Sequence, residues 1–453
     1  MSSKTPSQTT PHQTVLVQNV DLIVHAKWII PVVPKNTVLN DCAIVVDQQR
    51  IIAIKPSDNI HTRYSATEEY RLHNHVLMPG LINAHGHAAM TLLRGYADDL
   101  ALDTWLNDHI WPAEAQHVSA EFVRDGAELA IAEMIRSGTT CFSDMYFFPE
   151  ETAQAAHHAG MRCQITFPIF DFPCAWGNGP DDYMSKGLAL RDDYRNHDRI
   201  SIIFGPHAPY TVGDDTFSRI ANLAPEIQSG IQVHLHETQG EVDNAVNESG
   251  KRPIQRLYDL QVLTPTTQCV HMTAINDDDI TLLQKTGAHV IHCPESNLKL
   301  ASGFCPVDKL IKADVNVALG TDGTASNNNL DMFGEMHTAA LLGKAVAKDA
   351  AAVSAQQAIQ MATINGAKAM GIENDTGSLE IGKYADMIAI QLDDIEHAPL
   401  HDITSHIVYT HNGHRISHNW VNGQLLMKDR ELTTLNAKDI ANKARQWQEK
   451  IAP

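Results

Sequence analysis

The middle of the chain alternates short apolar runs with segments of helical periodicity. Continuous apolar runs of about four to eight residues predict buried strands, and apolar positions repeating every three or four residues predict amphipathic helices. Helices are expected at residues 120–136 and 215–223, among others. Strands are expected at residues 81–85, 140–145, 163–169, 200–205, 231–236, 267–272, 289–293 and 315–320. Eight successive βα units predict an α/β fold, a (β/α)8 barrel of the TIM type.

The two ends of the chain carry short β segments without intervening helices. The expected segments are 15–17, 22–24, 28–32, 42–46 and 51–54 near the start, and 387–391, 407–411, 420–421 and 425–427 near the end. Two β-rich ends around a different middle predict a small composite β-sandwich domain built from both termini. We therefore expect a polar, disordered tail over 1–13, a composite β domain from 14–78 plus 380–453, and the barrel over 79–379.

Composition narrows the classes of function. The chain has 453 residues, 43% of them hydrophobic, and a formal net charge of −20. An acidic chain is a poor match for nucleic acid or an anionic membrane surface, because both require a basic footprint. The seven cysteines are scattered and form no C-x-x-C motif, which predicts reduced thiols in a cytoplasmic protein. The N-terminus lacks the apolar core of a signal peptide, no apolar run could span a bilayer, and a homo-oligomer is left open.

Metal-binding side chains recur where the predicted strands end. Two histidines spaced i, i+2 leave the same face of a strand, although 25 histidines make such pairs common by chance. The position of all these side chains together is a more specific signal than one histidine pair, because TIM barrels place their catalytic residues at the C-terminal ends of the strands. The set comprises His85 and His87 (first strand), His207 (fourth), His234, His236 and Glu237 (fifth), His271 (sixth) and Asp322 (eighth).

These side chains suit a hydrolytic centre with one metal ion. Two histidines from the first strand, one from the fifth and the carboxylate of Asp322 leave room for a water molecule, whose pKa a divalent ion lowers. Glu237 is placed to move a proton to the substrate. On a regular strand His234 and His236 share a face while Glu237 points away, so spacing alone leaves the choice of histidine open.

Five longer motifs resemble a known family. They are GHAAMTLLRG at 86–95, WPAE at 111–114, GPHAPY at 205–210, SNLKL at 296–300 and GTDGTASNN at 320–328. The chain resembles, over nearly its whole length, the amidohydrolase superfamily and within it the 5-methylthioadenosine/S-adenosylhomocysteine deaminases, and less closely the related triazine hydrolases. The resemblance implies one divalent metal ion, usually zinc, held by His85, His87, His234 and Asp322. The family pattern H-x-x-E selects His234 together with Glu237.

The same resemblance implies roles around the substrate. Glu237 would carry a proton from water to the purine N1, His271 would orient the attacking oxygen, and Asp322 would take its remaining proton. The resemblance also implies that Glu114 accepts bonds from the ribose hydroxyls, that His207 contacts the nucleoside and that Trp105 forms part of the pocket wall. Simpler alternatives exist, because Glu114 would also suit the start of a helix and Trp105 would also serve as packing.

The expected reaction is hydrolysis of 5′-methylthioadenosine to 5′-methylthioinosine and ammonia, with adenosine and S-adenosylhomocysteine as further candidate substrates. Relatives can hold the carboxylate of S-adenosylhomocysteine with arginines after the third strand, but residues 164–190 contain none. Residues 163–170 and 200–209 contain no lysine or acid to bridge a second metal. Two alternatives remain: an aminohydrolase or chlorohydrolase of another nitrogen heterocycle (a triazine, a pterin or guanine), and a non-enzymatic barrel scaffold.

Overall fold

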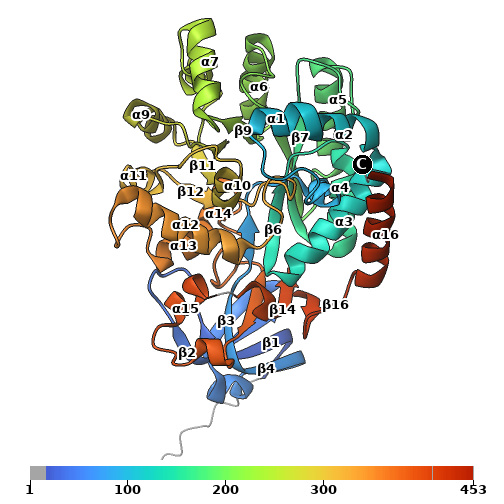
Figure 1. Cartoon of the computed structure of the whole chain (residues 1–453). Helices are drawn as coiled ribbons and strands as arrows, with labels where there is room; N and C mark the ends of the chain where they lie inside the picture. The colour runs from blue at the N-terminus through green and yellow to red at the C-terminus, as the bar shows by residue number, and fades with distance from the viewer. Residues whose placement is uncertain (1–16, 411, 452–453) are drawn as a thin grey trace, which may run out of the picture.

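The computed structural model describes residues 17–410 and 412–451 (Figure 1). The predicted tail 1–13 and most of the predicted strand 15–17 lie outside these residues. Two eight-stranded sheets organise the described chain, one of them parallel and the other mixed. Among the helices of this part of the chain, none is long and apolar enough to cross a membrane.

The parallel sheet forms the predicted barrel, with neighbouring strands in chain order. Its strands are β5 (Leu81–Asn83), β6 (Thr139–Asp144), β7 (Arg162–Ile169), β8 (Ile200–Pro206), β9 (Ile231–Leu235), β10 (Thr267–His271), β11 (His289–His292) and β12 (Val317–Leu319). The first and last strands also meet: just after β5, the amide of Ala84 donates a hydrogen bond to the carbonyl of Leu319 in β12 at 2.9 Å. All eight predicted barrel strands are confirmed.

Helices surround this barrel (Figure 1). They are α1 (Leu102–Thr104), α2 (Trp111–His117), α3 (Ala120–Arg136), α4 (Pro149–Ala159), α5 (Pro180–Asp193), α6 (Asp214–Glu226), α7 (Gln239–Ser249), α8 (Pro253–Asp259), α9 (Asp277–Thr286), α10 (Pro294–Lys299), α11 (Val307–Lys312), α12 (Met332–Ala347), α13 (Ala355–Met361) and α14 (Ile364–Ala369). A 3-10 turn η2 (Ala88–Leu93) follows β5, and a π-helical turn η3 (Trp105–Ile110) joins α1 to α2. Ser119 caps the N-terminus of helix α3, because its hydroxyl accepts a hydrogen bond from the Phe122 amide.

The mixed sheet combines strands from both ends of the chain, as predicted. Its order is β16-β15-β14-β13-β4-β1-β2-β3. The two ends meet where β13 pairs antiparallel with β4, from Met387 opposite Pro79 to Gln391 opposite His75. The strands are β1 (Gln18–Ile29), β2 (Leu39–Asp47), β3 (Arg50–Pro56), β4 (Tyr64–Pro79), β13 (Met387–Gln391), β14 (Ile416–Val421), β15 (Gln424–Lys428) and β16 (Glu431–Leu432).

One predicted strand is wrong. Residues 407–410 of the expected segment 407–411 belong to or follow helix α15 (Ile403–Tyr409), and residue 411 lies outside the described residues. The Asp402 side chain accepts a bond from the Ser405 amide and so begins a helix just upstream. A short apolar run such as Ile407 and Val408 does not distinguish a buried helix turn from a strand.

A buried ion pair joins the two sheets. Arg162 begins β7 of the barrel, and its Nε donates to Asp386 Oδ2 at 2.7 Å just before β13. The side chains are 6% and 0% exposed, so the pair lies away from water. The last helix, α16 (Ala437–Ile451), lies against α3 (Figure 1), where Trp447 Nε1 donates to Asp125 Oδ2 at 2.9 Å. The division of the chain at residues 79 and 380 stays a prediction.

Candidate metal centre and substrate pocket

Three histidines converge at the C-terminal mouth of the barrel. His85 and His87 follow β5, and His234 lies in β9. One nitrogen of each histidine lies within 4.8 Å of the others, and the Nε2 atoms of His85 and His234 are 3.2 Å apart. Asp322, just after β12, brings Oδ1 to 3.5 Å from His85 Nε2 and 3.2 Å from His87 Nε2. The structure therefore brings together the three histidines and Asp322, the four residues that the sequence predicted as ligands.

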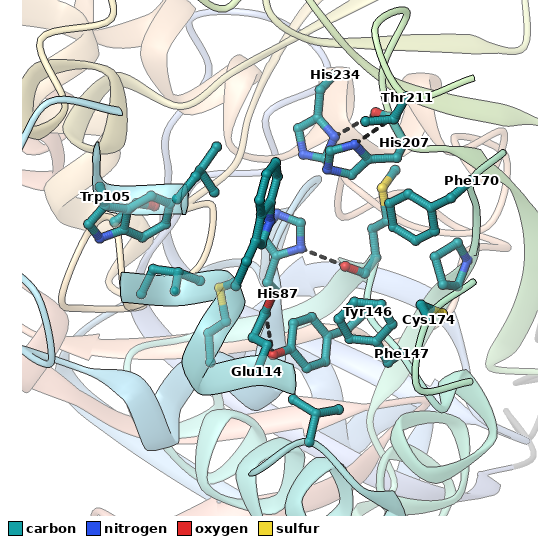
Figure 2. A pocket seen from close by; sticks show the side chains of 18 of the residues that line it. His87, Trp105, Glu114, Tyr146, Phe147, Phe170, Cys174, His207, Thr211 and His234 are labelled. Carbon is teal, nitrogen blue, oxygen red and sulfur yellow. Dashed lines mark hydrogen bonds between the residues drawn. The ribbon is translucent and has the colours of Figure 1, made fainter. Parts of the chain in front are cut away.

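The hydrogen bonds at Nδ1 of the three rings leave the Nε2 atoms available to bind a cation. Nδ1 of His85, His87 and His234 faces an oxygen acceptor in each case: Gln232 Oε1 at 2.8 Å, the Met145 carbonyl at 2.5 Å (Figure 2) and the His207 carbonyl at 2.8 Å. A ring that donates from Nδ1 keeps a lone pair at Nε2. Lone pairs only 3.2 Å apart repel each other unless a cation lies between them, so the donor set fits a divalent metal.

Asp322 is held in its ionised form beside the three histidines. Its backbone has a φ of 61°, which turns the chain sharply after β12. The hydroxyls of Ser296 and Ser326 donate to Oδ2 at 2.6 and 2.8 Å, leaving Oδ1 directed at the histidines. Burial alone would raise the pKa of Asp322, but the neighbouring His85 and His87 rings outweigh it and hold the pKa well below its usual range.

The choice between His234 and His236 depends on where β9 ends. The strand stops at Leu235, and His236 has a φ of 53°, which breaks the two-residue alternation of a strand. His236 turns away from the centre, with Nδ1 on the Ala274 carbonyl at 3.1 Å and Nε2 accepting from the Ile254 amide at 3.1 Å. As a result His234 and Glu237 both line the pocket.

Glu237 and His271 form a second group beside the ligands. His271 Nε2 lies 3.8 Å from Glu237 Oε2, and Ser302 donates to Glu237 Oε1 at 3.4 Å. Nδ1 of His271 faces Asn297 Oδ1 at 2.9 Å, which leaves Nε2 toward the pocket. Burial, reinforced by the negative charge of Asp322, raises the pKa of Glu237 to about 8. A carboxyl group with a pKa near neutrality can both accept and deliver a proton.

A cavity of about 390 Å³ opens in front of these groups (Figure 2). This volume falls in the range of small-ligand sites. Apolar and aromatic side chains make up most of its wall, including Trp105, which is 5% exposed, together with Phe147 and Phe170. Among the described residues that line it, none is a lysine or an arginine.

Two further predicted residues face the cavity. Glu114 of α2 is 8% exposed, and Tyr146 Oη donates to its Oε1 at 2.6 Å (Figure 2). Burial raises the pKa of Glu114 to about 7, although the bond from Tyr146 opposes the rise. His207 follows β8, and its Nδ1 lies 3.0 Å from Thr211 Oγ1. Burial and the nearby His87 and His85 lower the pKa of His207 to about 3, so its ring is neutral.

Sequence reasoning missed several residues of this site. Tyr146 lies two residues beyond β6 and carried no motif, and Gln232 is an internal strand residue. Ser296 and Asn297 were noted only as part of a family motif. Their roles depend on contacts across the barrel, such as Ser296 to Asp322, which no local spacing predicts.

The fold and the metal centre together define the class: a metal-dependent hydrolase built on a TIM-type barrel. Comparison with known proteins gives the same class. Residues 76–426 match the model of the amidohydrolase family, and the chain belongs to this family. It is 57% identical over 432 residues to a 5-methylthioadenosine/S-adenosylhomocysteine deaminase from Teredinibacter turnerae, covering 95% of this chain and 98% of the relative. The predicted family resemblance is confirmed.

Other relatives extend this result. A 5′-deoxyadenosine deaminase from Methanosarcina mazei is 39% identical over 435 residues, covering 95% of this chain and 98% of the relative. The crystal structure of an adenosine deaminase from Xanthomonas campestris with bound zinc superposes with a TM-score of 0.95 at 43% identity, covering 96% and 99% of the two chains. An atrazine chlorohydrolase from Arthrobacter aurescens has a TM-score of 0.88 at 21% identity over 94% and 99%, and so shares the fold.

Proposed function

We propose that this protein is a zinc-dependent aminohydrolase that converts 5′-methylthioadenosine and water to 5′-methylthioinosine and ammonia. The observation that carries the proposal is the arrangement of one largely apolar cavity whose wall includes Glu237, the buried Glu114, and His87 and His234 of the histidine cluster. The names of the relatives, which are deaminases of adenosine derivatives, support it.

Each group near the reacting carbon has a distinct task. His85, His87, His234 and Asp322 would hold the ion, which when bound supplies a water molecule of lowered pKa. Glu237 takes a proton from this water and delivers it to the purine N1, as its pKa of about 8 permits. His271 would offer Nε2 to orient the attacking oxygen, and Asp322 would take the second proton and pass it to the C6 amino group, which leaves as ammonia.

Glu114 and His207 would bind the nucleoside beyond the base. A carboxylate accepts two hydroxyl bonds at once, so Glu114 suits the adjacent 2′ and 3′ hydroxyls of a ribose. Tyr146 occupies only one of its oxygens. The neutral His207 ring can contact the same nucleoside, and Trp105 would contribute wall surface. A heterocycle without ribose, such as a triazine or pterin, makes no use of Glu114.

The cavity favours a neutral, apolar 5′ substituent. Phe170 and Phe172 line it, and no cationic side chain among its described lining residues could pair with the carboxylate of S-adenosylhomocysteine. A carboxylate buried without a partner carries a large desolvation cost. The neighbouring hollow is acidic, and its two cations, Lys251 and Arg256, already pair with Asp259 and Asp214. We therefore propose that methylthioadenosine is preferred over S-adenosylhomocysteine.

An ultraviolet deamination assay tests the proposal. It compares kcat/KM for methylthioadenosine, adenosine, S-adenosylhomocysteine, adenine and a chlorotriazine with the zinc-loaded protein. We expect methylthioadenosine to be the best substrate and adenine to be poor. Faster turnover of the chlorotriazine would overturn the nucleoside assignment, and a higher kcat/KM for S-adenosylhomocysteine would overturn the 5′ preference alone.

The remaining parts of the proposal concern setting and stoichiometry. We propose one zinc ion at the barrel mouth, because the described residues gather one group of metal-binding side chains there, His85, His87 and His234. The proposal includes a cytoplasmic location, which fits seven cysteines that are all free thiols. Neither nucleic acid nor membrane is proposed as a partner, and a homo-oligomer is compatible with the proposal.

A further inference from the structure

A row of buried amides lies beneath the metal centre. Gln232 of β9, Gln268 of β10 and Gln164 of β7 are 0%, 1% and 3% exposed. Gln232 and His234 are two residues apart on β9 and so share its inward face, and Gln268 is the register partner of Gln232. Barrel interiors are normally filled by branched apolar side chains, so three glutamines at this position require an explanation.

The three amides bond in one direction. Gln164 Nε2 donates to the Met370 carbonyl at 3.3 Å, and Gln268 Nε2 donates to Gln164 Oε1 at 2.8 Å. Gln232 Nε2 then donates to Gln268 Oε1 at 2.6 Å and to the Ala84 carbonyl at 3.0 Å. Because carbonyls only accept, the two backbone oxygens determine which end of each amide is the donor. Gln232 Oε1 must therefore face His85 Nδ1, 2.8 Å away.

His85 is the one histidine of the three whose Nδ1 depends on a side chain. The Nδ1 acceptors of His87 and His234 are the backbone carbonyls of Met145 and His207, which cannot exchange donor and acceptor. A glutamine amide can rotate by half a turn and present its NH2 group instead. The orientation of Gln232 therefore needs support, and Gln268, Gln164 and the Ala84 carbonyl supply it.

We infer that Gln232, supported by Gln268 and Gln164, is a positioning residue that keeps His85 in the tautomer able to bind metal. If His85 carried its proton on Nε2, that N–H would point at His234 Nε2, only 3.2 Å away. The two ligands would then bond to each other and close the site. With the proton on Nδ1 both lone pairs stay available. The amide row acts before the metal arrives, by removing this competing bond.

The inference rests on the metal centre of the proposed function, and its test measures zinc affinity rather than turnover. An error in the substrate assignment would therefore leave the result unchanged. The dissociation constant for Zn²⁺ is measured on the full chain by competition with a chelator, alongside thermal unfolding of the metal-free form. In Gln232→Leu we expect zinc binding to weaken by about 10- to 100-fold, the usual effect of losing a partner of a ligating histidine.

Three further variants separate positioning from general stability. Gln268→Leu leaves Gln232 in place but unsupported, so we expect a smaller but measurable loss of affinity. Gln232→Glu keeps an acceptor for His85 while losing the bonds that the amide donates to Ala84, Ser143 and Gln268, and it should recover most of the affinity. Asn419→Leu is the matched control, because this fully buried amide donates to the Ile135 and Thr139 carbonyls at 3.0 Å, away from the centre. It should lower stability alone.

Either of two results would overturn the inference. One is zinc affinity in Gln232→Leu within about twofold of the wild type, where a lost histidine partner predicts at least about tenfold. The other is an equal loss in Asn419→Leu, which would make the effect one of stability. If Gln232→Leu does not fold, the comparison of Gln268→Leu with Asn419→Leu decides, because neither variant adds a charge and positioning predicts weaker zinc binding in the first alone.

Discussion

The bond between Tyr146 and Glu114 offers a quantitative test of ribose recognition. The Tyr146 hydroxyl donates to the Glu114 carboxyl at 2.6 Å inside the cavity wall. This length is that of a charge-assisted O–H···O bond. The bond lowers the pKa of Glu114, which burial has raised to about 7. Tyr146→Phe removes the bond and retains the ring, so the pKa of Glu114 should rise further.

The expected rise in the pKa of Glu114 follows from the energy of the lost hydrogen bond. A hydrogen bond to a charged group contributes about 1.5–3 kcal/mol, which corresponds to about one to two pKa units. Glu114 is then half ionised at pH 7 in the wild type but only about a tenth to a hundredth ionised in the variant. If ribose binding requires the carboxylate, kcat/KM for nucleosides at pH 7 should fall by about 5- to 50-fold. At high pH, where Glu114 ionises in both proteins, the difference should disappear.

The assay is a pH profile of kcat/KM for methylthioadenosine and for adenine. Adenine has no ribose, so the ratio of the two values isolates Glu114 from groups such as Glu237 that act on both substrates. Tyr258→Phe is the matched control, because that hydroxyl accepts a bond from Lys285 on the outer surface. If the ratio in Tyr146→Phe stayed equal to that of the wild type from pH 6 to pH 9, Glu114 would not bind ribose through its carboxylate.

Three more outcomes are expected. Glu237→Gln should lower kcat by about 10²- to 10⁴-fold while metal analysis still finds one equivalent, and retained turnover would exclude its proton transfer. Zinc analysis of the wild type should find one ion at the barrel mouth, and a chelator should remove this ion and the activity together. Two tightly bound ions at the barrel mouth would refute the single centre. Asp386→Asn should lower the free energy of unfolding by about 3–5 kcal/mol, because Arg162 then keeps a buried charge without its partner. Denaturant titration measures this loss. The double variant Arg162→Met/Asp386→Leu is the control, and its free energy of unfolding should lie nearer that of the wild type.

The sequence predicted the fold well where the local pattern was long and repeated. The eight barrel strands and helix α3 stand where apolar periodicity placed them, since burial of an apolar face forms both kinds of element. The segment at 407–411 was wrong because a short apolar run fits either structure, and the capping bond from Asp402 decided for a helix. The long strand β4 was missed because its exposed half is polar.

Some residues of the candidate site could likewise be predicted from the sequence, and others could not. His85, His87, His234 and Asp322 could be proposed as a set because strand ends converge in a barrel, whatever the details of packing. The choice of His234 over His236 needed the family pattern, and its physical cause is the positive φ at His236. Tyr146 was beyond prediction, since its bond to Glu114 joins residues 32 positions apart.

By itself, the sequence determined the order of strands and helices, a composite β domain from both ends of the chain and the chemical kinds of side chain at the strand ends. These features follow from the spacing of apolar residues and from the order of residues along the chain, and both can be read from the sequence. Only the tertiary structure decided which nitrogen of each histidine faces the centre, that Gln232 supports His85, and that Glu114 is buried beside Tyr146. Such features depend on distances of a few ångströms between residues far apart in the chain, and no spacing along the sequence encodes them.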